Sequence, residues 1–182
     1  AAAFAGTADS VLALADVANE AAREEIVTGL GLCDCRVALG ALDRPARRIE
    51  TRWMASQRDI DRHLLGLLSE APQRAIIHVS QRVEAGRIAA LVRDECGFDA
   101  LDLTTLAPTE FGKALRRFRE GGLRVIVTTG SLEAGADWPQ VPLSVVVGLP
   151  PDLGTLHAQM SVATAADARA VLLHERGEQE AL

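Results

Sequence analysis

The chain has 182 residues, of which 48% are hydrophobic and 24% charged, and its formal net charge is −6 at pH 7. A chain of this size and apolar content can bury the core of one globular domain, and its negative net charge excludes a general attraction to nucleic acid, so any such contact must be local. Acidic residues or arginines interrupt every apolar run before the roughly 18 residues of a membrane span, and the apolar start 1–5 lacks the basic flank of a secretory signal; we therefore expect a cytoplasmic protein without membrane contact.

Short segments rich in Val, Ile and Leu alternate along the chain with segments of helical periodicity. This alternation is typical of an α/β three-layer sandwich, in which helices flank a mainly parallel sheet. Strands are predicted at 11–15, 36–39, 48–54, 75–79, 100–103, 124–128, 143–148 and 170–174. Helices are predicted at 19–30, 57–69, 81–96, 109–120 and 153–160.

Residues with known preferences for helix ends support these elements. Asn19 is a suitable N-cap, and Gly31 and Gly97 stand where a left-handed C-cap is needed. Within 81–96, four apolar positions recur at helical spacing and are predicted to face the sheet: Val83, Ile88, Leu91 and Val92.

Two common kinds of site are missing from the sequence. The three cysteines (Cys33, Cys35 and Cys96) and the four histidines lack metal-ligand spacing, so we predict no metal site and interpret the thiols as buried or unreactive. The only Gly-Lys pair, Gly112-Lys113, is followed by alanine within a predicted helix. The chain therefore has no phosphate loop, which requires Ser or Thr at that point.

Several segments, taken in order, resemble RecQ-type DNA helicases. The segments 11–14, 26–32 and 42–45 resemble the passage from the first RecA-like lobe of these enzymes into the second. Residues 76–82 are similar to helicase motif IV, residues 118–129 to the approach to motif V, and residues 137–141 follow at the spacing of the family.

The resemblance implies a division of the chain into three parts. Residues 1–41 would be the end of a preceding RecA-like lobe with a connecting helix, residues 42–174 a second RecA-like helicase lobe, and residues 175–182 a polar tail. The implied fold is the RecA-like form of the three-layer sandwich.

The family pattern is altered at the positions that serve ATP hydrolysis. Motif III reads Ala15–Ala18 without a hydroxyl, and a turn that is usually His-Ala-Gly reads Leu103–Thr105. In motif V the paired glycines become Glu133 and Gly135. Both arginine positions of motif VI are alanine, and such arginines stabilise the charge on a transferring phosphoryl group. The degenerate ATP-site positions implied by the resemblance are Gly135, Asp137, Gln159, Ala163 and Ala166.

Seven residues are candidate contacts for a nucleic-acid backbone. Ser80 and Arg82 follow the predicted strand 75–79, and Thr129 and Ser131 accompany the end of 124–128, where ligands of parallel sheets collect. Lys113, Arg116 and Arg117 share one face of the predicted helix 109–120. The competing interpretations are a capping Ser80, a turn that satisfies its own backbone, and solvated basic side chains. Trp53, on a predicted strand, is interpreted as a core residue.

Two hypotheses remain at this point. In the first, the chain is a RecQ-like helicase C-terminal lobe that contributes to DNA binding and unwinding within a larger ATP-dependent helicase or helicase-derived protein. Its partners would be weakly bound single-stranded DNA and a preceding RecA-like lobe or partner protein, and ATP and Mg would be cofactors only if that lobe is competent. In the second, the chain is a catalytically inactive pseudo-helicase module that binds protein or nucleic acid as a scaffold. Both assign no catalytic residue to this chain, which is predicted to be inactive alone.

Overall fold

The chain divides into two compact units, Ala1–Asp43 and Arg44–Leu182. The computed structural model describes residues 10–15, 20–38, 48–70, 74–130 and 139–175. In the first unit the described residues contain one helix, α2 (Glu20–Leu30), which ends at Gly31 with the predicted positive φ of 61°. The predicted strand 11–15 is wrong, because these residues are exposed and irregular, and residues 36–38 are irregular as well. An extended segment becomes a strand only when another strand takes up its backbone hydrogen bonds.

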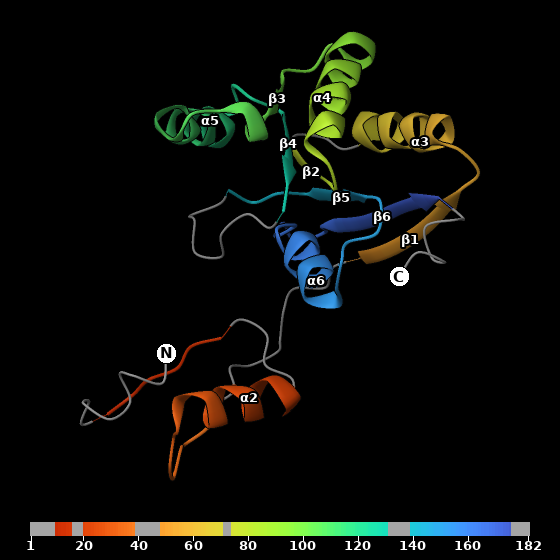
Figure 1. The fold of residues 1–182 in the computed structure, drawn as a ribbon. Coiled ribbons are helices and arrows are strands. Elements are labelled where there is room, and N and C mark those ends of the chain that lie inside the picture. Colours follow the sequence, from red (N-terminus) through yellow and green to blue (C-terminus); the bar gives the residue numbers. More distant parts are fainter. Residues whose placement is uncertain (1–9, 16–19, 39–47, 71–73, 131–138, 176–182) are drawn as a thin grey trace. The chain divides into compact units, whose positions relative to one another are not determined.

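The second unit is built on a six-stranded sheet in which every pairing is parallel. The strands lie in the order β1-β6-β5-β2-β4-β3 (Figure 1). Their bounds are β1 (Arg48–Met54), β2 (Ala75–Val79), β3 (Ala100–Asp102), β4 (Val125–Thr129), β5 (Leu143–Val147) and β6 (Arg169–Glu175). The central strands β2 and β5 are buried along their whole length, as expected for parallel strands covered on both faces.

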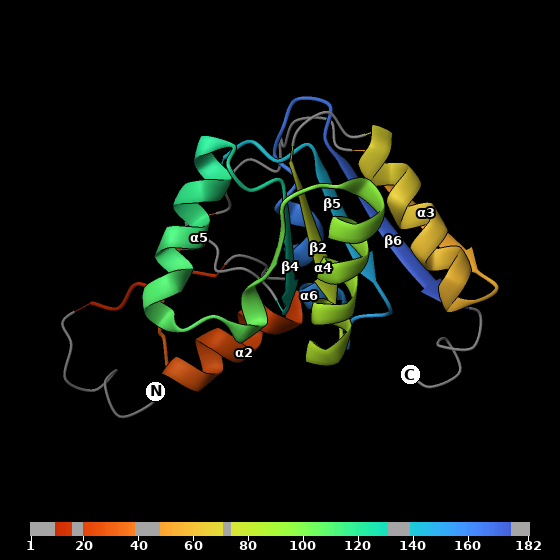
Figure 2. The same cartoon turned by 90° about the horizontal axis from the view of Figure 1, so that it is seen from above.

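Helices cover both faces of this sheet. The helices α3 (Gln57–Glu70) and α4 (Arg82–Cys96) pack on one face, where Ile77 of β2 lies in their shared core. The helices α5 (Pro108–Glu120) and α6 (Leu153–Ser161) pack on the other, where Phe118 contacts the core around Ile76. Figure 2 shows α5 and α3 at opposite ends of the sheet. The predicted α/β three-layer sandwich is confirmed, with element bounds that differ from the prediction by a few residues.

The apolar face predicted for the helix 81–96 is partly wrong. Ile88 and Val92 are buried in α4, but Val83 is 83% exposed. The buried face of α4 begins at Ala85, two positions after Val83. Two positions along an α-helix correspond to a rotation of about 200° around its axis. Val83 therefore lies opposite that face. The helix ends at Gly97 with φ 65°, as predicted.

Trp53 is not a core residue, contrary to the prediction. It is 60% exposed on β1, which is the first strand in the sheet order. The helix α6 packs chiefly on β5 and β6, so it leaves this side of β1 largely uncovered. Of the thiols interpreted as buried or unreactive, those of Cys33 and Cys35 are exposed, while Cys96 is half-buried and burial raises its pKa.

Candidate nucleic-acid interface

Two of the candidate contact residues lie at neighbouring strand ends. The strands β2 and β4 pair in parallel, with Val79 beside Thr129. Ser80 follows Val79 and is exposed, and Thr129 is half-buried at the last position of β4. Because the carboxyl ends of parallel strands meet at one edge of the sheet, Ser80 and Thr129 share a surface.

The helix α4 begins at this surface without a side-chain cap. Its N-cap residue is Gln81, with extended backbone angles (φ −127°, ψ 143°) and no capping hydrogen bond from the side chain. Within the described part of the chain, Ser80 does not cap the helix either, and Arg82 is exposed with no ion pair. The exposed Arg82 is thus the first residue of a helix whose first N–H groups lack a side-chain cap, an arrangement suited to an anion.

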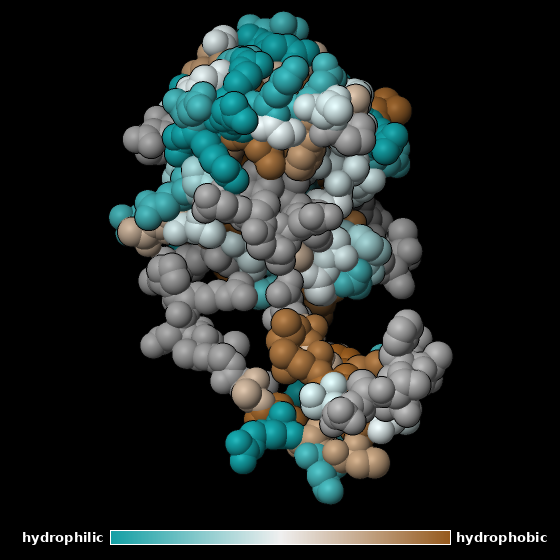
Figure 3. All heavy atoms as spheres, turned by 90° about the vertical axis from the view of Figure 1, so that its left-hand side faces the viewer, coloured by the Kyte–Doolittle hydropathy of each residue, from teal (hydrophilic) through white to brown (hydrophobic). Residues whose placement is uncertain are grey.

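The three basic candidate residues of α5 differ in their contacts with the rest of the chain. Hydrophilic side chains cover the outward side of α5 (Figure 3), and Lys113 and Arg116 are exposed there. Arg117 instead forms an ion pair with Asp99 and donates to the Gly122 carbonyl at 3.3 Å. The helix connects the parallel strands β3 and β4 and so runs back along the sheet. Its basic residues therefore recede from the edge that carries Ser80, and their contact with nucleic acid stays a prediction.

Three sequence candidates lie outside the described residues, namely Ser131, Gly135 and Asp137. Their predicted roles follow from the resemblance alone.

The two alanines that the resemblance aligns with motif VI arginines have different surroundings. Ala163 is 1% exposed and packs in a core cluster with Val146, Met160 and Ala170. Ala166 is exposed. Gln159, on α6, is 5% exposed, and its backbone carbonyl accepts a hydrogen bond of 2.9 Å from Ser144 Oγ. Neither alanine carries a side-chain hydrogen-bond donor, and the amide group of Gln159, which could donate, is buried.

The turn that the resemblance aligns with His-Ala-Gly forms hydrogen bonds among its own polar groups. Leu103–Thr105 form a short 3-10 helix, η1. Thr104 donates its hydroxyl to the Asp102 carboxylate at 2.7 Å, and Thr105 donates to the Asp102 backbone carbonyl at 3.2 Å. These hydroxyl groups therefore stabilise the turn.

His78 is a residue of the site that sequence reasoning missed. It is fully buried on β2, and its Nδ1 lies 3.1 Å from the Gly130 carbonyl oxygen. A carbonyl only accepts, so Nδ1 carries the proton. Burial lowers the pKa of His78 to about 4, although the backbone of Gly130 and Gln159 opposes the shift. His78 is therefore neutral near pH 7.

Two buried atoms around His78 lack hydrogen bonds. His78 Nε2 and Gln159 Oε1 have no partner of acceptable geometry in the described part of the chain. The signal that could have revealed this site is a polar residue within the apolar run of residues 75–79, because a buried polar group requires a specific partner. His78 connects β2, the end of β4 and α6.

Comparison by sequence gives no match, neither to a protein-family model nor to a curated protein. Comparison by structure finds helicase domains. The C-terminal domain of a Dbp5 variant from S. cerevisiae, solved bound to Gle1 and IP6, is 22% identical with a TM-score of 0.64, and the match covers 74% of this chain and 80% of that one.

Two further structures belong to longer DEAD-box proteins. The yeast splicing factor Prp28 is 17% identical with a TM-score of 0.70, over 87% of this chain and 36% of that one. A DEAD box protein from Methanococcus jannaschii is 17% identical with a TM-score of 0.58, over 75% of this chain and 37% of that one. This chain thus spans little more than a third of these two proteins. The likeness shows the RecA-like fold of helicase C-terminal domains, and it does not single out the RecQ type.

The described residues contain neither a candidate membrane helix nor a candidate metal cluster. No helix among them has the length and apolar character to cross a membrane. No group of three or more His, Cys, Asp or Glu side chains gathers there in a way that could hold a metal ion.

Proposed function

We propose that the chain is the second RecA-like lobe of a helicase-derived protein of the RecQ type, and that it binds the backbone of single-stranded DNA weakly. The observation that carries this proposal is the surface shared by Ser80, Thr129 and the uncapped start of α4. It combines hydroxyl groups, free N–H groups and the guanidinium of Arg82, which are the groups that contact phosphates without reading sequence.

The net charge of −6 limits the strength of this binding. Only a local cluster can attract phosphate, and few contacts release few counterions, so we expect weak and salt-sensitive binding. DNA is the ligand that the RecQ resemblance implies. A match described as the RNA-helicase Prp28 from Chaetomium thermophilum, 17% identical, makes RNA the natural comparison in the assay.

The second candidate function is a scaffold without catalytic activity. The burial of Ala163 and Gln159 favours it for the isolated chain, because neither residue can reach a bound nucleotide from inside the core. The two functions are compatible if ATP is bound and hydrolysed by another part of the protein.

Replacing Arg82 by glutamine is expected to weaken single-strand binding. In fluorescence anisotropy at low salt, a labelled 20-nucleotide DNA should bind the unmodified chain with a dissociation constant of ~10–100 µM, the range of non-specific binding. The Arg82→Gln variant should bind roughly three- to tenfold more weakly, with a salt slope reduced by about 0.7.

Arg62→Gln is the matched control. The Arg62 side chain is 71% exposed on α3 and pairs only with Asp59 within the described residues, an exposed pair of small energy. Its variant should bind like the unmodified chain. Equal weakening by both substitutions, or no binding even at low salt, would contradict the interface. Tighter binding of the matching RNA would move the proposal from DNA to RNA.

The isolated chain is expected to show no ATP hydrolysis above background, with or without single-stranded DNA. The reason is that it has neither a phosphate loop nor motif VI arginines. The measurement is release of inorganic phosphate at saturating ATP and Mg²⁺. A turnover that disappears when Arg82 is replaced would refute this prediction, whereas a turnover insensitive to any substitution would indicate a contaminant.

A further inference from the structure

The outer edge of β1 is open among the described strands. β1 pairs with β6 on one side and is the terminal strand in the sheet order. It is seven residues long, and two of its large apolar residues are well exposed, Ile49 at 61% and Trp53 at 60%. Edge strands with these properties are templates for pairing with another strand.

The two sides of β1 carry different chemistry. Side chains alternate along a strand, so Ile49, Thr51 and Trp53 lie on the side away from α3. Arg48, Glu50 and Arg52 lie on the α3 side.

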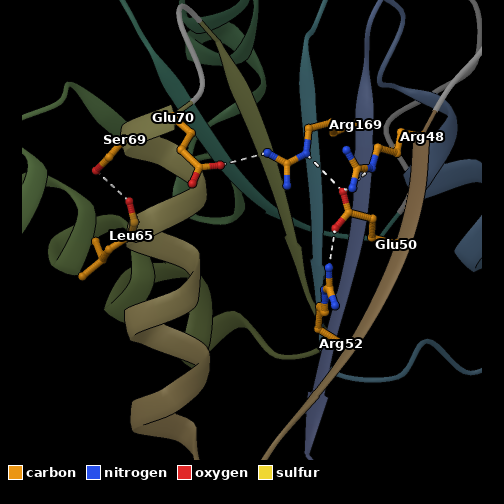
Figure 4. Close-up of polar contacts among 7 residues, drawn as sticks. All are labelled: Arg48, Glu50, Arg52, Leu65, Ser69, Glu70 and Arg169. Carbon is orange, nitrogen blue, oxygen red and sulfur yellow. Dashed lines mark hydrogen bonds and ion pairs between the residues drawn. The ribbon is translucent and has the colours of Figure 1, made fainter.

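The charges on the α3 side form one network, drawn in Figure 4. Glu50 Oε1 accepts from Arg48 Nε at 3.0 Å and from Arg169 Nε at 3.3 Å, and Glu50 Oε2 accepts from Arg52 at 3.1 Å. Arg169 also reaches Glu70 at 3.1 Å. Burial raises the pKa of Glu50, but the hydrogen bond from Arg52 and the charges of Arg169 and Arg48 together lower it. Glu50 is thus a carboxylate among arginines, two of which are more than half exposed.

The sequence of β1 is self-complementary in one antiparallel register. If two copies meet with Thr51 opposite the partner's Thr51, Glu50 lies opposite the partner's Arg52 and Ile49 lies opposite the partner's Trp53. Opposite charges and aromatic–aliphatic pairs stabilise such a ladder by about 0.2–1 kcal/mol each. Arg48 then meets the partner's Met54, so no like charges face each other.

The two registers centred one residue to either side of Thr51, on Glu50 or on Arg52, are unfavourable. Centring the pair on Glu50 places two carboxylates opposite each other and Arg48 opposite the partner's Arg52. Centring it on Arg52 places two arginines opposite each other. Like charges directly opposite are destabilising, so the pattern of β1 selects the register centred on Thr51.

We propose that β1 is a dimerisation strand, which pairs antiparallel with β1 of a second copy of this chain about Thr51. The sheet would continue through the interface as twelve strands, twice the six of one copy. An open groove of about 490 Å³ between β1 and α3, lined by Arg52, His63 and Glu70 among others, leaves space for the partner's side chains.

The size and symmetry of this interface have two consequences. One short strand from each copy forms a small interface, so the dimer is weak, with a dissociation constant of ~10–100 µM. The twofold axis reverses the strand direction, so the surfaces around Ser80 in the two copies point in opposite directions. The dimer therefore leaves both proposed nucleic-acid surfaces accessible.

Cysteine cross-linking tests the register. In the full chain carrying Cys33→Ser and Cys35→Ser, which removes the exposed thiols, Thr51→Cys should form a disulfide-linked dimer under mild oxidation at ~50 µM. The two paired positions are about 4.5–5.5 Å apart in an antiparallel ladder, within disulfide reach.

Ile49→Cys in the same background is the matched control. In this register, residue 49 of one copy lies four strand positions, roughly 13 Å, from residue 49 of the partner. It should not cross-link to itself, but should cross-link when mixed with Trp53→Cys. Self-linking of Ile49→Cys, or no linking of Thr51→Cys, would overturn the register.

Sedimentation equilibrium tests the association without cross-links. The unmodified chain should show a reversible monomer–dimer equilibrium, and Ile49→Asp should weaken it at least tenfold because a carboxylate then faces the apolar ring of the partner's Trp53. Val83→Asp makes the same change at an 83% exposed position of α4 and should leave it unchanged. A monomer at all concentrations up to ~300 µM, or equal effects of both variants, would refute the proposal.

Discussion

The Ala163→Arg variant is expected to lose about 4 kcal/mol or more of its free energy of unfolding. Ala163 is 1% exposed and packed against Met160, Val146 and Ala170, so an arginine there must either displace this cluster or bury an unpaired charge. A loss of this size is a large part of the total stability of a typical domain. Urea denaturation followed by circular dichroism measures it.

Ala166→Arg is the matched control for this prediction. Ala166 is exposed only three positions away, so its variant should unfold within about 0.5 kcal/mol of the unmodified chain. If Ala163→Arg were equally well tolerated, the core around α6 would be looser than the structure describes. The expected contrast is that an arginine is tolerated at position 166 but not at position 163, because only position 163 lies in the core.

Acidification is expected to destabilise the lobe through His78 by about 3 kcal/mol. The pKa of His78 is about 4 in the folded chain, below the ordinary value of 6.5. Between these two values the unfolded chain binds more protons than the folded chain, so stability falls as the pH falls. The contribution of neutral His78 is complete above pH 6.5 and is lost on the way down to about pH 4. The measurement is the free energy of unfolding in urea at several pH values from 7.5 to 4.

His78→Phe isolates this effect from the titration of carboxylates. Phenylalanine fills a similar volume without an ionisable group, and the Gly130 carbonyl that it leaves belongs to an exposed residue that water can reach. The stability difference between the unmodified chain and this variant should shrink or reverse by about 3 kcal/mol between pH 7 and pH 4. A difference that is independent of pH would show that His78 is not buried as a neutral group.

His78 of β2 contacts the backbone of Gly130 and of Gln159, so its protonation is expected to affect DNA binding as well as stability. Two of the segments that meet at His78, the end of β2 and the end of β4, carry the proposed DNA contacts Ser80 and Thr129. Protonation of His78 would therefore loosen the contact surface as well as the core.

Much of the fold could be predicted because its elements are encoded locally. β1 and β2 were predicted with their observed bounds, since polar and apolar residues alternate along most of β1 and β2 is a short, mainly apolar run, two patterns that favour strands. Gly97 ends α4 as predicted because only glycine adopts a positive φ at low cost. The carboxyl-end placement of Ser80 and Thr129 followed from the same local signals, once the sheet was known to be parallel.

The errors concern properties that depend on distant neighbours. The segment 11–15 has the composition of a strand but no strand beside it within the described residues. Trp53 was interpreted as core because strands are usually covered, but only the order of strands makes β1 an edge. The burial of His78 and Ala163 depends on how α6 packs on the sheet, which no sequence spacing reports.

The sequence by itself determined the fold class of this protein, an α/β sandwich of alternating strands and helices. Only the tertiary structure decided which strands are neighbours, which alanine is core and which is surface, and where His78 is buried with one ring nitrogen unpaired among the described residues. The physical reason is the separation in sequence between the residues that determine each feature. Helix and strand periodicity, caps and turns arise from residues a few positions apart, whereas strand order, edges and burial arise from contacts between segments separated by tens of residues.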